Sequence, residues 1–269
     1  MGSYKNLTTF DFLKTFAVIM MIIDHVGFYF LTPPLGADIG DPALWLRVFG
    51  RFCVPIWFFL IGYARTQTIP LTWVAGALDD PAALDDLVRG ADVVLHIAGV
   101  VNAPDRAGFE AGNGTGTANV IAAMQRAGCK RLIHVSSFAA RNPDLSDYCW
   151  SKALAEEKVK ASGLDWTILR PPAVYGPRDT EFIEVMKVAR YGLMPVPPTG
   201  RASLIHVRDL ARVLVSLCTA EGDSYLGATW EVDDGAPNGL SHLELAAAFG
   251  RALQRRVIPL PLPQALLML

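Results

Sequence analysis

Apolar and polar residues form two different patterns along the chain, and the change between them falls near residue 70. Before this point the sequence contains two long apolar runs, Thr15–Leu31 and Phe52–Ala64. After it, short apolar runs of strand length alternate with amphipathic segments of helix length. The change predicts a membrane-type helical segment over residues 1–68 and an α/β domain over residues 71–269.

The two apolar runs are close to the roughly 20 residues that a membrane-spanning helix needs. Acidic side chains, Asp38 and Asp41, occupy the connector between the runs. The basic side chains that flank the runs on the opposite side are Lys5, Lys14, Arg51 and Arg65. This asymmetry predicts a membrane hairpin through residues 12–65, with both ends and the α/β domain in the cytoplasm. The alternative is a pair of buried helices in a soluble cytoplasmic protein.

Polar residues inside these runs carry a first resemblance. Asp24 and His25 stand late in the first run, and Gly50-Arg51 followed by Pro55 marks the second. Ionisable groups at membrane depth are costly, and they are usually paired, functional or near a helix end. The pattern resembles the opening of the TraX-like family of small polytopic membrane proteins, which are similar to membrane acyltransferases. Members of that family have several more helices than the two expected here.

The second pattern predicts alternating strands and helices. Strands are expected over Leu71–Gly76, Asp92–Ala98, Arg131–Val135 and Trp166–Arg170, and helices over Asp80–Arg89, Thr115–Ala127 and Tyr148–Ala161. Continuous apolar runs are typical of parallel strands that are buried on both faces. Strands that alternate with helices of this size indicate βαβ units. The sequence therefore predicts an α/β fold with an incomplete Rossmann-type parallel sheet and flanking helices.

Charge and cysteine content exclude several classes of function. The formal net charge is −2 and no cluster of lysine and arginine is present, which argues against a nucleic-acid partner. The four cysteines include no CxxC pair, so free thiols are expected rather than disulfides or a metal site. Hydrophobic residues make up 52% of the chain, and the excess lies in the N-terminal runs.

A tyrosine–lysine pair begins one predicted helix and carries the candidate chemistry. Tyr148 and Lys152 are four residues apart and therefore share a helical face. A nearby ammonium favours the phenolate and lowers a tyrosine pKa from its usual value of about 10, which allows proton exchange with an alcohol or carbonyl. Ser137 ends the preceding strand, where its hydroxyl could hold a substrate oxygen. The alternatives are a solvated helix pair and a serine that caps a turn or helix.

These residues belong to a set of motifs with a second, more specific resemblance. The motifs in chain order are VAGALDD (Val74–Asp80), DVVLHIAG (Asp92–Gly99), NGTGTANVIAA (Asn113–Ala123), RLIHVSS (Arg131–Ser137), YCWSK with Tyr148 and Lys152, LRPPAVYGPRD (Leu169–Asp179) and IHVRDLARVL (Ile205–Leu214). Over residues 71–269 the chain resembles the extended branch of the short-chain dehydrogenase/reductase family, also described as NAD-dependent epimerases and dehydratases.

The resemblance implies hydride transfer between NAD or NADP and a carbonyl or alcohol substrate. Tyr148 would act as acid and base, Lys152 would lower the tyrosine pKa and hold the ribose hydroxyls, and Ser137 would polarise the carbonyl. The residues that would line the cofactor are Leu78, Ala98, Gly99, Asn113, Lys152 and Pro172. Relatives of this kind act on nucleotide sugars, sterols, flavonoids and quinone-like compounds, so the small-molecule substrate stays open. They often form homodimers through an interface that includes the Tyr148 helix.

Several parts of the family pattern differ in this sequence. The family begins with a strand, a GxxGxxG loop that approaches the pyrophosphate, and a helix, but no such motif occurs before residue 71. Gly112, Gly114 and Gly116 do not replace it, because their family counterpart is the start of a helix. Ala77 stands where the adenine-contact motif usually has aspartate. These differences put cofactor binding, and the choice between NAD and NADP, in question.

Three functions follow from this reading. The first is an NAD(P)-dependent oxidoreductase or epimerase, and the second is a non-catalytic fusion remnant. The third is a membrane protein of acyltransferase type with the α/β part as an appendage. A gene fusion is the simplest account of the two patterns. Loss of the first βαβ unit would leave an apolar sheet edge, which the N-terminal helices could cover.

Overall fold

A parallel sheet forms the centre of the computed structural model, which describes residues 16–19, 74–177, 179 and 181–262. Within those residues the sheet has five strands in the order β1-β2-β3-β4-β9, and each neighbouring pair is parallel. The strands are β1 (Phe16–Ile19), β2 (Val93–His96), β3 (Arg131–Val135), β4 (Asp165–Arg170) and β9 (Ala228–Glu231). The predicted α/β fold with a parallel Rossmann-type sheet is confirmed.

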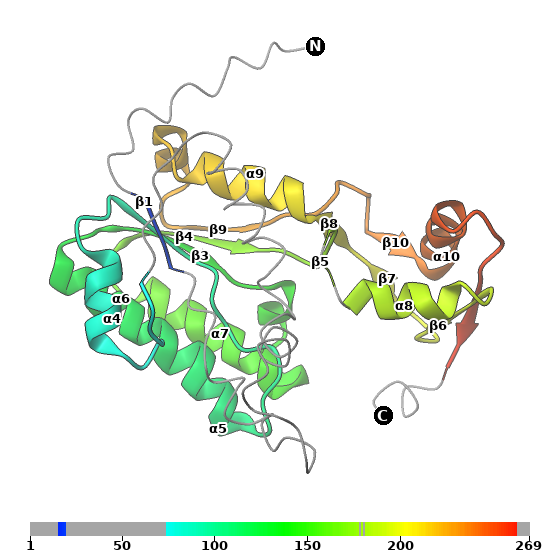
Figure 1. Cartoon of the computed structure of the whole chain (residues 1–269), viewed down its shortest axis with the longest axis horizontal. Coiled ribbons are helices and arrows are strands. Elements are labelled where there is room, and N and C mark those ends of the chain that lie inside the picture. Colours follow the sequence, from blue (N-terminus) through cyan, green and yellow to red (C-terminus); the bar gives the residue numbers. More distant parts are fainter. Residues whose placement is uncertain (1–15, 20–73, 178, 180, 263–269) are drawn as a thin grey trace.

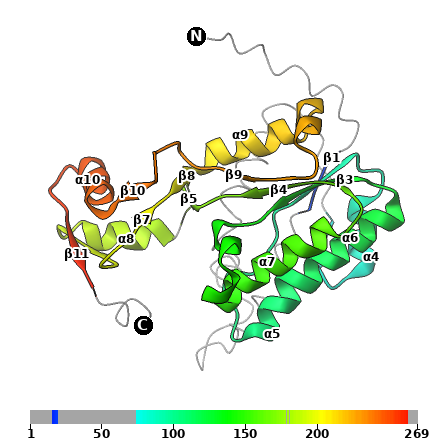
Figure 2. The same cartoon turned by 180° about the vertical axis from the view of Figure 1, so that it is seen from behind.

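Helices cover both faces of this sheet (Figures 1 and 2). One face carries α4 (Pro81–Val88), α6 (Gly116–Ala127) and α7 (Asp147–Lys160), and the other carries α9 (Val207–Leu217). Alternate residues of each strand face the two layers, so Val94 and Leu132 pack with α4 and α6, while Leu95 packs with α9. The face under α4, α6 and α7 is the one on which the predicted tyrosine–lysine pair lies.

The ends of these helices follow from local sequence signals. Asp80 caps α4 by accepting hydrogen bonds of 3.1 Å from the amides of Ala82 and Ala83, with Pro81 in the first turn. Gly128 ends α6 in the left-handed conformation, with a φ of 72°. Ser146 caps α7 by accepting from the amide of Cys149. The three predicted helices are confirmed to within a few residues.

A π-helical turn, η2 (Glu110–Thr115), joins the short helix α5 (Arg106–Phe109) to α6. Its glycines belong to helical backbone that packs closely against neighbouring side chains. A Cβ on Gly112 would lie 2.2 Å from Val100, and one on Gly114 would lie 2.8 Å from Leu154. These glycines therefore permit close packing of helices and loop, and the rejection of a phosphate loop in this segment is supported.

Replacing Gly112 with alanine should destabilise the protein by about 1–3 kcal/mol, because the new methyl group overlaps the Val100 side chain. Thr115→Ala, at an exposed position of the same π-helical turn, is the matched control and should change stability by less than about 0.5 kcal/mol. Urea unfolding of both variants measures the difference. Equal stability of the two variants would show that the backbone relaxes to admit the methyl group.

The N-terminal segment contributes β1, which corrects one expectation. Residues 16–19 were expected inside a membrane-type helix, yet they form a strand whose register pairs Phe16 with Val93 and Ile19 with His96. A short run of aromatic and β-branched residues suits a strand, and the edge of β2 offers unpaired backbone groups. The expected apolar edge is therefore paired with a strand among the described residues.

Two further expectations concern the segments around β1. Within the described part of the chain, no helix combines the length and apolar character needed to cross a bilayer. The remainder of the predicted hairpin, with Asp24, His25 and Arg51, lies outside the described residues. The strand expected over Leu71–Gly76 is wrong for its described part, since residues 74–76 pair with no strand there. Val74 instead packs its side chain against the core without ladder hydrogen bonds.

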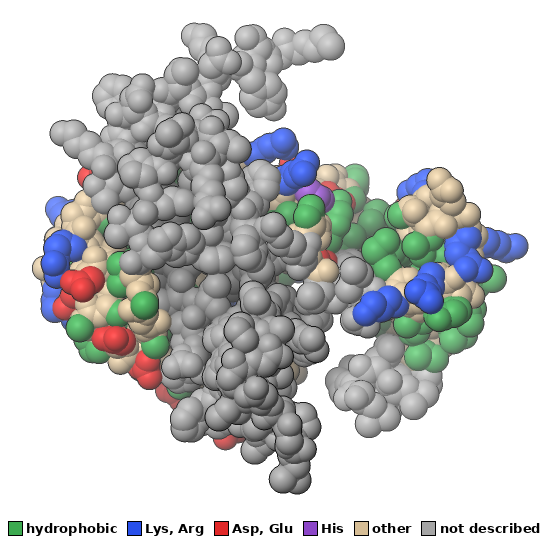
Figure 3. All heavy atoms as spheres, viewed as in Figure 1, with side chains coloured by type: hydrophobic (Ala, Val, Ile, Leu, Met, Phe, Trp, Pro, Cys, Tyr) green, Lys and Arg blue, Asp and Glu red, His purple; other side chains and the backbone are tan. Residues whose placement is uncertain are grey.

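A smaller unit lies beyond the carboxyl end of β4 (Figure 1). It contains three two-stranded pairs, β5 with β8, β6 with β11 and β7 with β10, among the described residues. Its elements are β5 (Ala173–Tyr175), α8 (Glu181–Ala189), β6 (Leu193–Val196), β7 (Arg201–Ala202), β8 (Leu204–His206), β10 (Leu240–Ser241), α10 (His242–Ala252) and β11 (Ile258–Pro261); η5 (Ala220–Tyr225) follows α9. Lysine and arginine side chains gather beside hydrophobic ones on its surface (Figure 3).

Candidate active site

The candidate site lies at the carboxyl ends of β2, β3 and β4, where parallel α/β sheets bind ligands. Gly99 follows β2, Ser137 follows β3, and Pro171-Pro172 follow β4. Backbone hydrogen bonds join the last two segments, because the Phe138 amide donates to the Pro171 carbonyl at 3.0 Å. Helix α7 crosses this edge, with Tyr148 in its first turn.

Lys152 occupies the buried centre of this edge. Its side chain is 5% exposed, and its Nζ donates to the Val135 carbonyl at 3.1 Å. A Cβ built on Gly99 would lie 3.6 Å from this Nζ and 3.0 Å from Asn113 Oδ1. Three of the predicted residues, Gly99, Asn113 and Lys152, are therefore brought together, and a side chain at position 99 would crowd the Asn113 amide.

Asn113 connects three segments of the site. Its Oδ1 accepts from the Val100 amide at 2.7 Å, and its Nδ2 donates to the Val100 carbonyl and to Ser151 Oγ, each at 2.8 Å. The side chain is 2% exposed, so the protein itself uses its polar atoms. Asn113 holds the loop after β2 against the helix that carries Lys152, which places the loop rather than presenting an amide to a ligand.

Tyr148 and Ser137 are both half-buried at the same edge. The Tyr148 ring lies 6.1 Å from the Phe109 ring, centroid to centroid, and the two are tilted by 57°. Ser137 Oγ accepts from the Ala139 amide at 3.2 Å and caps the short helix η3 (Phe138–Arg141). A hydroxyl that accepts one hydrogen bond keeps its own proton to donate, so this cap is compatible with holding a carbonyl oxygen.

The remaining predicted residues lie at the margins of the site. Ala98 is buried at the end of β2, and Pro172 is half-buried after β4. Leu78 packs into the core beside Gly116, and its carbonyl accepts from Asn119 Nδ2 at 2.8 Å. The side chains of Leu78 and Ala98 thus belong to the core cluster on the α4 and α6 face.

Two buried histidines on the sheet, His96 and His134, are a feature that sequence reasoning missed. His96 and His134 pair in register on β2 and β3, and their ring centroids are 5.1 Å apart. His96 Nε2 is 3.0 Å from Thr117 Oγ1, whereas His96 Nδ1 and both ring nitrogens of His134 are buried without a hydrogen-bond partner. Burial, reinforced by the Lys152 charge, lowers the pKa of His96 to about 3. Burial, with His96 and Lys152, lowers the pKa of His134 well below 6.5.

A buried carboxylate forms the second feature that sequence reasoning missed. Glu156 is 1% exposed, yet it accepts hydrogen bonds from Ser136 and Arg170. Burial alone raises the pKa of this carboxyl, but the hydrogen bonds from Arg170 and Ser136 outweigh burial and lower the pKa. The same contact with Glu156 raises the pKa of Arg170. Glu156 is therefore charged within the protein at neutral pH.

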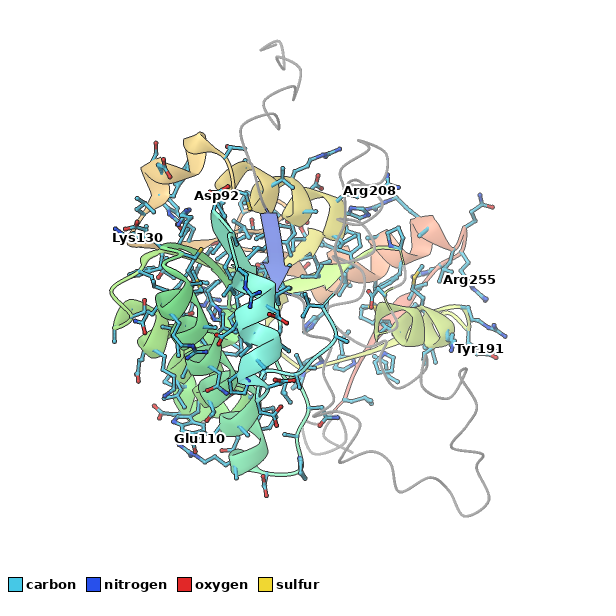
Figure 4. The ribbon with its side chains drawn as sticks, turned by 60° about the vertical axis from the view of Figure 1, so that its left-hand side comes forward. Asp92, Glu110, Lys130, Tyr191, Arg208 and Arg255 are labelled. Atoms are coloured by element: carbon cyan, nitrogen blue, oxygen red, sulfur yellow. The ribbon has the colours of Figure 1, made fainter. Side chains whose placement is uncertain are left out.

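The opposite edge of the sheet contains a polar hollow of about 270 Å³, lined in part by Asp92, Lys130 and Arg131. Figure 4 places Asp92 and Lys130 just ahead of β2 and β3, at the end of the strands away from Glu110. Arg131 is committed to the fold there, because its guanidinium donates to the Asp165 carbonyl and to Thr167 Oγ1 at 3.0 and 2.8 Å. This hollow lies at the opposite end of the strands from the tyrosine–lysine pair.

The donor set at the carboxyl edge fits the ribose and nicotinamide half of a dinucleotide. Lys152 brings an ammonium group with N–H donors to this edge, where one of them binds the Val135 carbonyl. Gly99 leaves a close approach to the backbone, where a Cβ would make a tight contact of 3.0 Å with Asn113 Oδ1. Lys152 and Tyr148 would hold the ribose, and the Gly99 loop would lie against the ring system. A parallel sheet with helices on both faces and such an edge defines a Rossmann-type nucleotide-binding domain.

The chain belongs to the NAD(P)H-binding family, whose sequence profile matches residues 64–221. A relative named ceramide reductase, from Caulobacter vibrioides (strain NA1000 / CB15N), is 40% identical over 194 residues, which are 71% of this chain and 60% of that protein. The 2-alkyl-3-oxoalkanoate reductase of Stenotrophomonas maltophilia (strain K279a) is 28% identical over 219 residues, or 70% of this chain and 66% of that protein. The chain thus spans about 60% of the first relative.

Solved structures show the same fold. MoeE5 in complex with UDP-glucose and NAD superimposes with a TM-score of 0.64 and 20% sequence identity, over 78% of this chain and 81% of that chain. At this identity the likeness establishes the architecture and leaves the substrate open. Fold and family together place the chain among NAD(P)H-binding proteins of Rossmann type.

Proposed function

We propose that the chain reduces a ketone, or oxidises the corresponding alcohol, at the edge formed by Ser137, Tyr148 and Lys152. The observation that carries the proposal is the placement of Tyr148 and Lys152 on one face of α7, with Lys152 buried beside Gly99 at the carboxyl end of β2. A bound nicotinamide would supply or accept the hydride. Tyr148 would give a proton to the carbonyl oxygen, and Ser137 would hold that oxygen with its hydroxyl.

Lys152 has two tasks in this proposal. Its ammonium favours the phenolate of Tyr148, which eases proton exchange near neutral pH. Its ammonium would also bind ribose hydroxyls, while the bond to the Val135 carbonyl holds it at the end of β3. Asn113 supports both tasks indirectly, because it ties the Gly99 loop to α7 through Ser151.

The proposed substrate class is a ketone on an alkyl chain. Two relatives support this choice by their names, one for ceramide, a lipid, and the other for a 2-alkyl-3-oxoalkanoate. The smaller unit next to the site exposes apolar side chains, including Leu193 at 45% and Ile258 at 48%, which suits an apolar substrate better than a nucleotide sugar. Both observations favour the reductase over an acyltransferase function.

The test is reduction of a medium-chain β-keto ester by the purified chain, monitored as the decrease in NADH or NADPH absorbance. We expect turnover with one of the two cofactors, and no turnover in the Lys152→Met variant. UDP-glucose with NAD serves as the comparison for sugar chemistry. Cofactor binding without turnover of either compound would reject the alkyl-ketone assignment, and absence of binding would favour a non-catalytic remnant.

A further inference from the structure

We propose that Glu156, together with Ser136 and Arg170, is a positioning cluster that sets the placement of Tyr148 and Lys152 relative to Ser137. This inference rests on the proposed reductase function. It concerns residues that contact neither the reacting atoms nor the region expected for the cofactor.

Helix periodicity places Glu156 on the reactive face of α7. It stands one turn after Lys152 and two turns after Tyr148, and its side chain is 1% exposed. By contrast, the next residue, Glu157, is exposed. A carboxylate that is buried in line with the proposed acid and its lysine costs desolvation energy, so the fold must offset it with specific contacts.

The contacts of Glu156 reach two strand ends at once. Its Oε1 accepts from Ser136 Oγ at 2.6 Å and from Arg170 Nε at 2.7 Å, while its Oε2 accepts from Arg170 Nη2 at 2.7 Å and from Lys160 Nζ at 3.2 Å. Ser136 directly follows β3, and Arg170 ends β4. The paired, parallel hydrogen bonds between Arg170 and Glu156 fix both distance and orientation.

The cluster is attached to the backbone that presents Ser137. The Ser136 amide donates to the Leu169 carbonyl at 2.7 Å, and the Phe138 amide donates to the Pro171 carbonyl at 3.0 Å. Helix α7 is therefore hydrogen-bonded to the end of β3 at two successive turns. Lys152 binds the Val135 carbonyl, and Glu156 binds the Ser136 hydroxyl. Two such points fix the rotation and the translation of the helix face, and Ser137 is the next residue along the chain.

The cluster continues outward through a second carboxylate. Arg170 Nη1 lies 3.5 Å from Glu231 Oε1, and Arg141 Nη1 lies 3.2 Å from Glu231 Oε2. Arg141 ends the short helix η3 that Ser137 caps. The contacts from Glu156 through Arg170 and Glu231 thus reach Arg141, at the far end of the short helix that Ser137 caps.

The first variant set separates position from stability. Glu156→Gln keeps the shape of the side chain and removes its charge. Ser136→Ala removes only the hydrogen bond between Ser136 Oγ and Glu156. Glu157→Gln is the matched control, because Glu157 is the next residue in the helix and its side chain is exposed. A shift of about 1 Å in reacting groups can lower a rate about 100-fold, so we expect kcat to fall about 10–100-fold in Glu156→Gln and less in Ser136→Ala. KM for the keto ester and the activity of the control should stay near wild type.

The double variant Glu156→Met/Arg170→Met separates the charge pair from packing. Apolar replacement of a buried ion pair often keeps or raises stability. We therefore expect a thermal midpoint within a few degrees of wild type together with the low kcat of Glu156→Gln. A stable double variant with wild-type kcat would overturn the proposal, because packing alone would then position the helix.

Hydrogen exchange provides a readout that does not depend on catalysis. In Glu156→Gln and Ser136→Ala, the amides of Ser136 and Phe138 should exchange at least about tenfold faster than in wild type, while α6 and α9 keep their rates. Unchanged exchange at these amides would contradict the cluster even if the wild-type chain reduces no ketone. Faster local exchange in a chain without activity would leave the positioning role standing and reject the reductase function instead.

Discussion

Replacing Tyr148 with phenylalanine is expected to lower kcat for ketone reduction by about 10²–10⁴-fold, the usual contribution of a positioned general acid. The hydroxyl is the group that the proposal assigns to proton transfer, and the ring itself lies beside Phe109 at the start of α7. Phenylalanine keeps the ring and therefore the packing. Steady-state kinetics with the β-keto ester and the preferred cofactor measure the change.

Two controls make the result specific to the hydroxyl. Tyr191→Phe removes a hydroxyl at a position that is 72% exposed in the smaller unit, and it should leave kcat unchanged. Cofactor affinity of Tyr148→Phe should fall by less than about tenfold, because Lys152 remains to bind the ribose. Retention of more than a tenth of wild-type kcat by Tyr148→Phe would show that another group or a water molecule protonates the product.

Acidification is expected to destabilise the protein steeply as the pH falls below about 6.5. The folded-state pKa of His96 is about 3, against an ordinary value of 6.5, and that of His134 is also lowered. A histidine with a lowered folded pKa binds more protons when unfolded. Its stabilising contribution is complete above pH 6.5 and is lost as the pH falls from there towards the folded pKa. Each such histidine contributes a slope of about 1.4 kcal/mol per pH unit.

The His134→Leu variant should flatten this pH dependence. Leucine places an apolar side chain where two ring nitrogens lack partners, so we expect stability at pH 8 to be equal to or above wild type. Between about pH 6 and pH 4 the free energy of unfolding should fall more slowly than in wild type. His242→Gln, at a half-buried position, is the control. Parallel curves for wild type and His134→Leu would mean that the buried pair opens or takes up protons without unfolding.

The sequence predicted the middle of the fold well because its signals there are local. A continuous apolar run predicted β2, and Asp80 and Gly128 supplied a helix cap and a left-handed helix end. The tyrosine–lysine spacing of four residues placed both side chains on one face of α7 without knowledge of the tertiary structure.

The parts that sequence reasoning missed depend on tertiary contacts. Glu156 and Glu157 are adjacent and chemically identical, and only the packing of α7 on the strand ends buries one of them. Ser136 and Ser137 are equally ambiguous, and the structure assigns one to Glu156 and the other to a helix cap. Strand β1 was missed because four residues of a long apolar run carry no signal that separates a strand from a helix.

The N-terminal part bears on cofactor binding, because it supplies strand β1 where the family has its first βαβ unit. The sequence contains no GxxGxxG motif, which approaches the pyrophosphate in folds of this kind. The proposed reductase activity requires that Lys152, Tyr148 and the Gly99 loop bind a nicotinamide dinucleotide.

Thermal unfolding of the full chain with and without millimolar NADH or NADPH tests that claim most directly. A ligand at 100 times its dissociation constant stabilises the native state by about 2.7 kcal/mol, and we expect a rise in the thermal midpoint with at least one cofactor. Lys152→Met should abolish the rise, whereas Lys158→Met, on the same helix, should keep it. No rise with either cofactor, or an equal rise in Lys152→Met, would contradict the account.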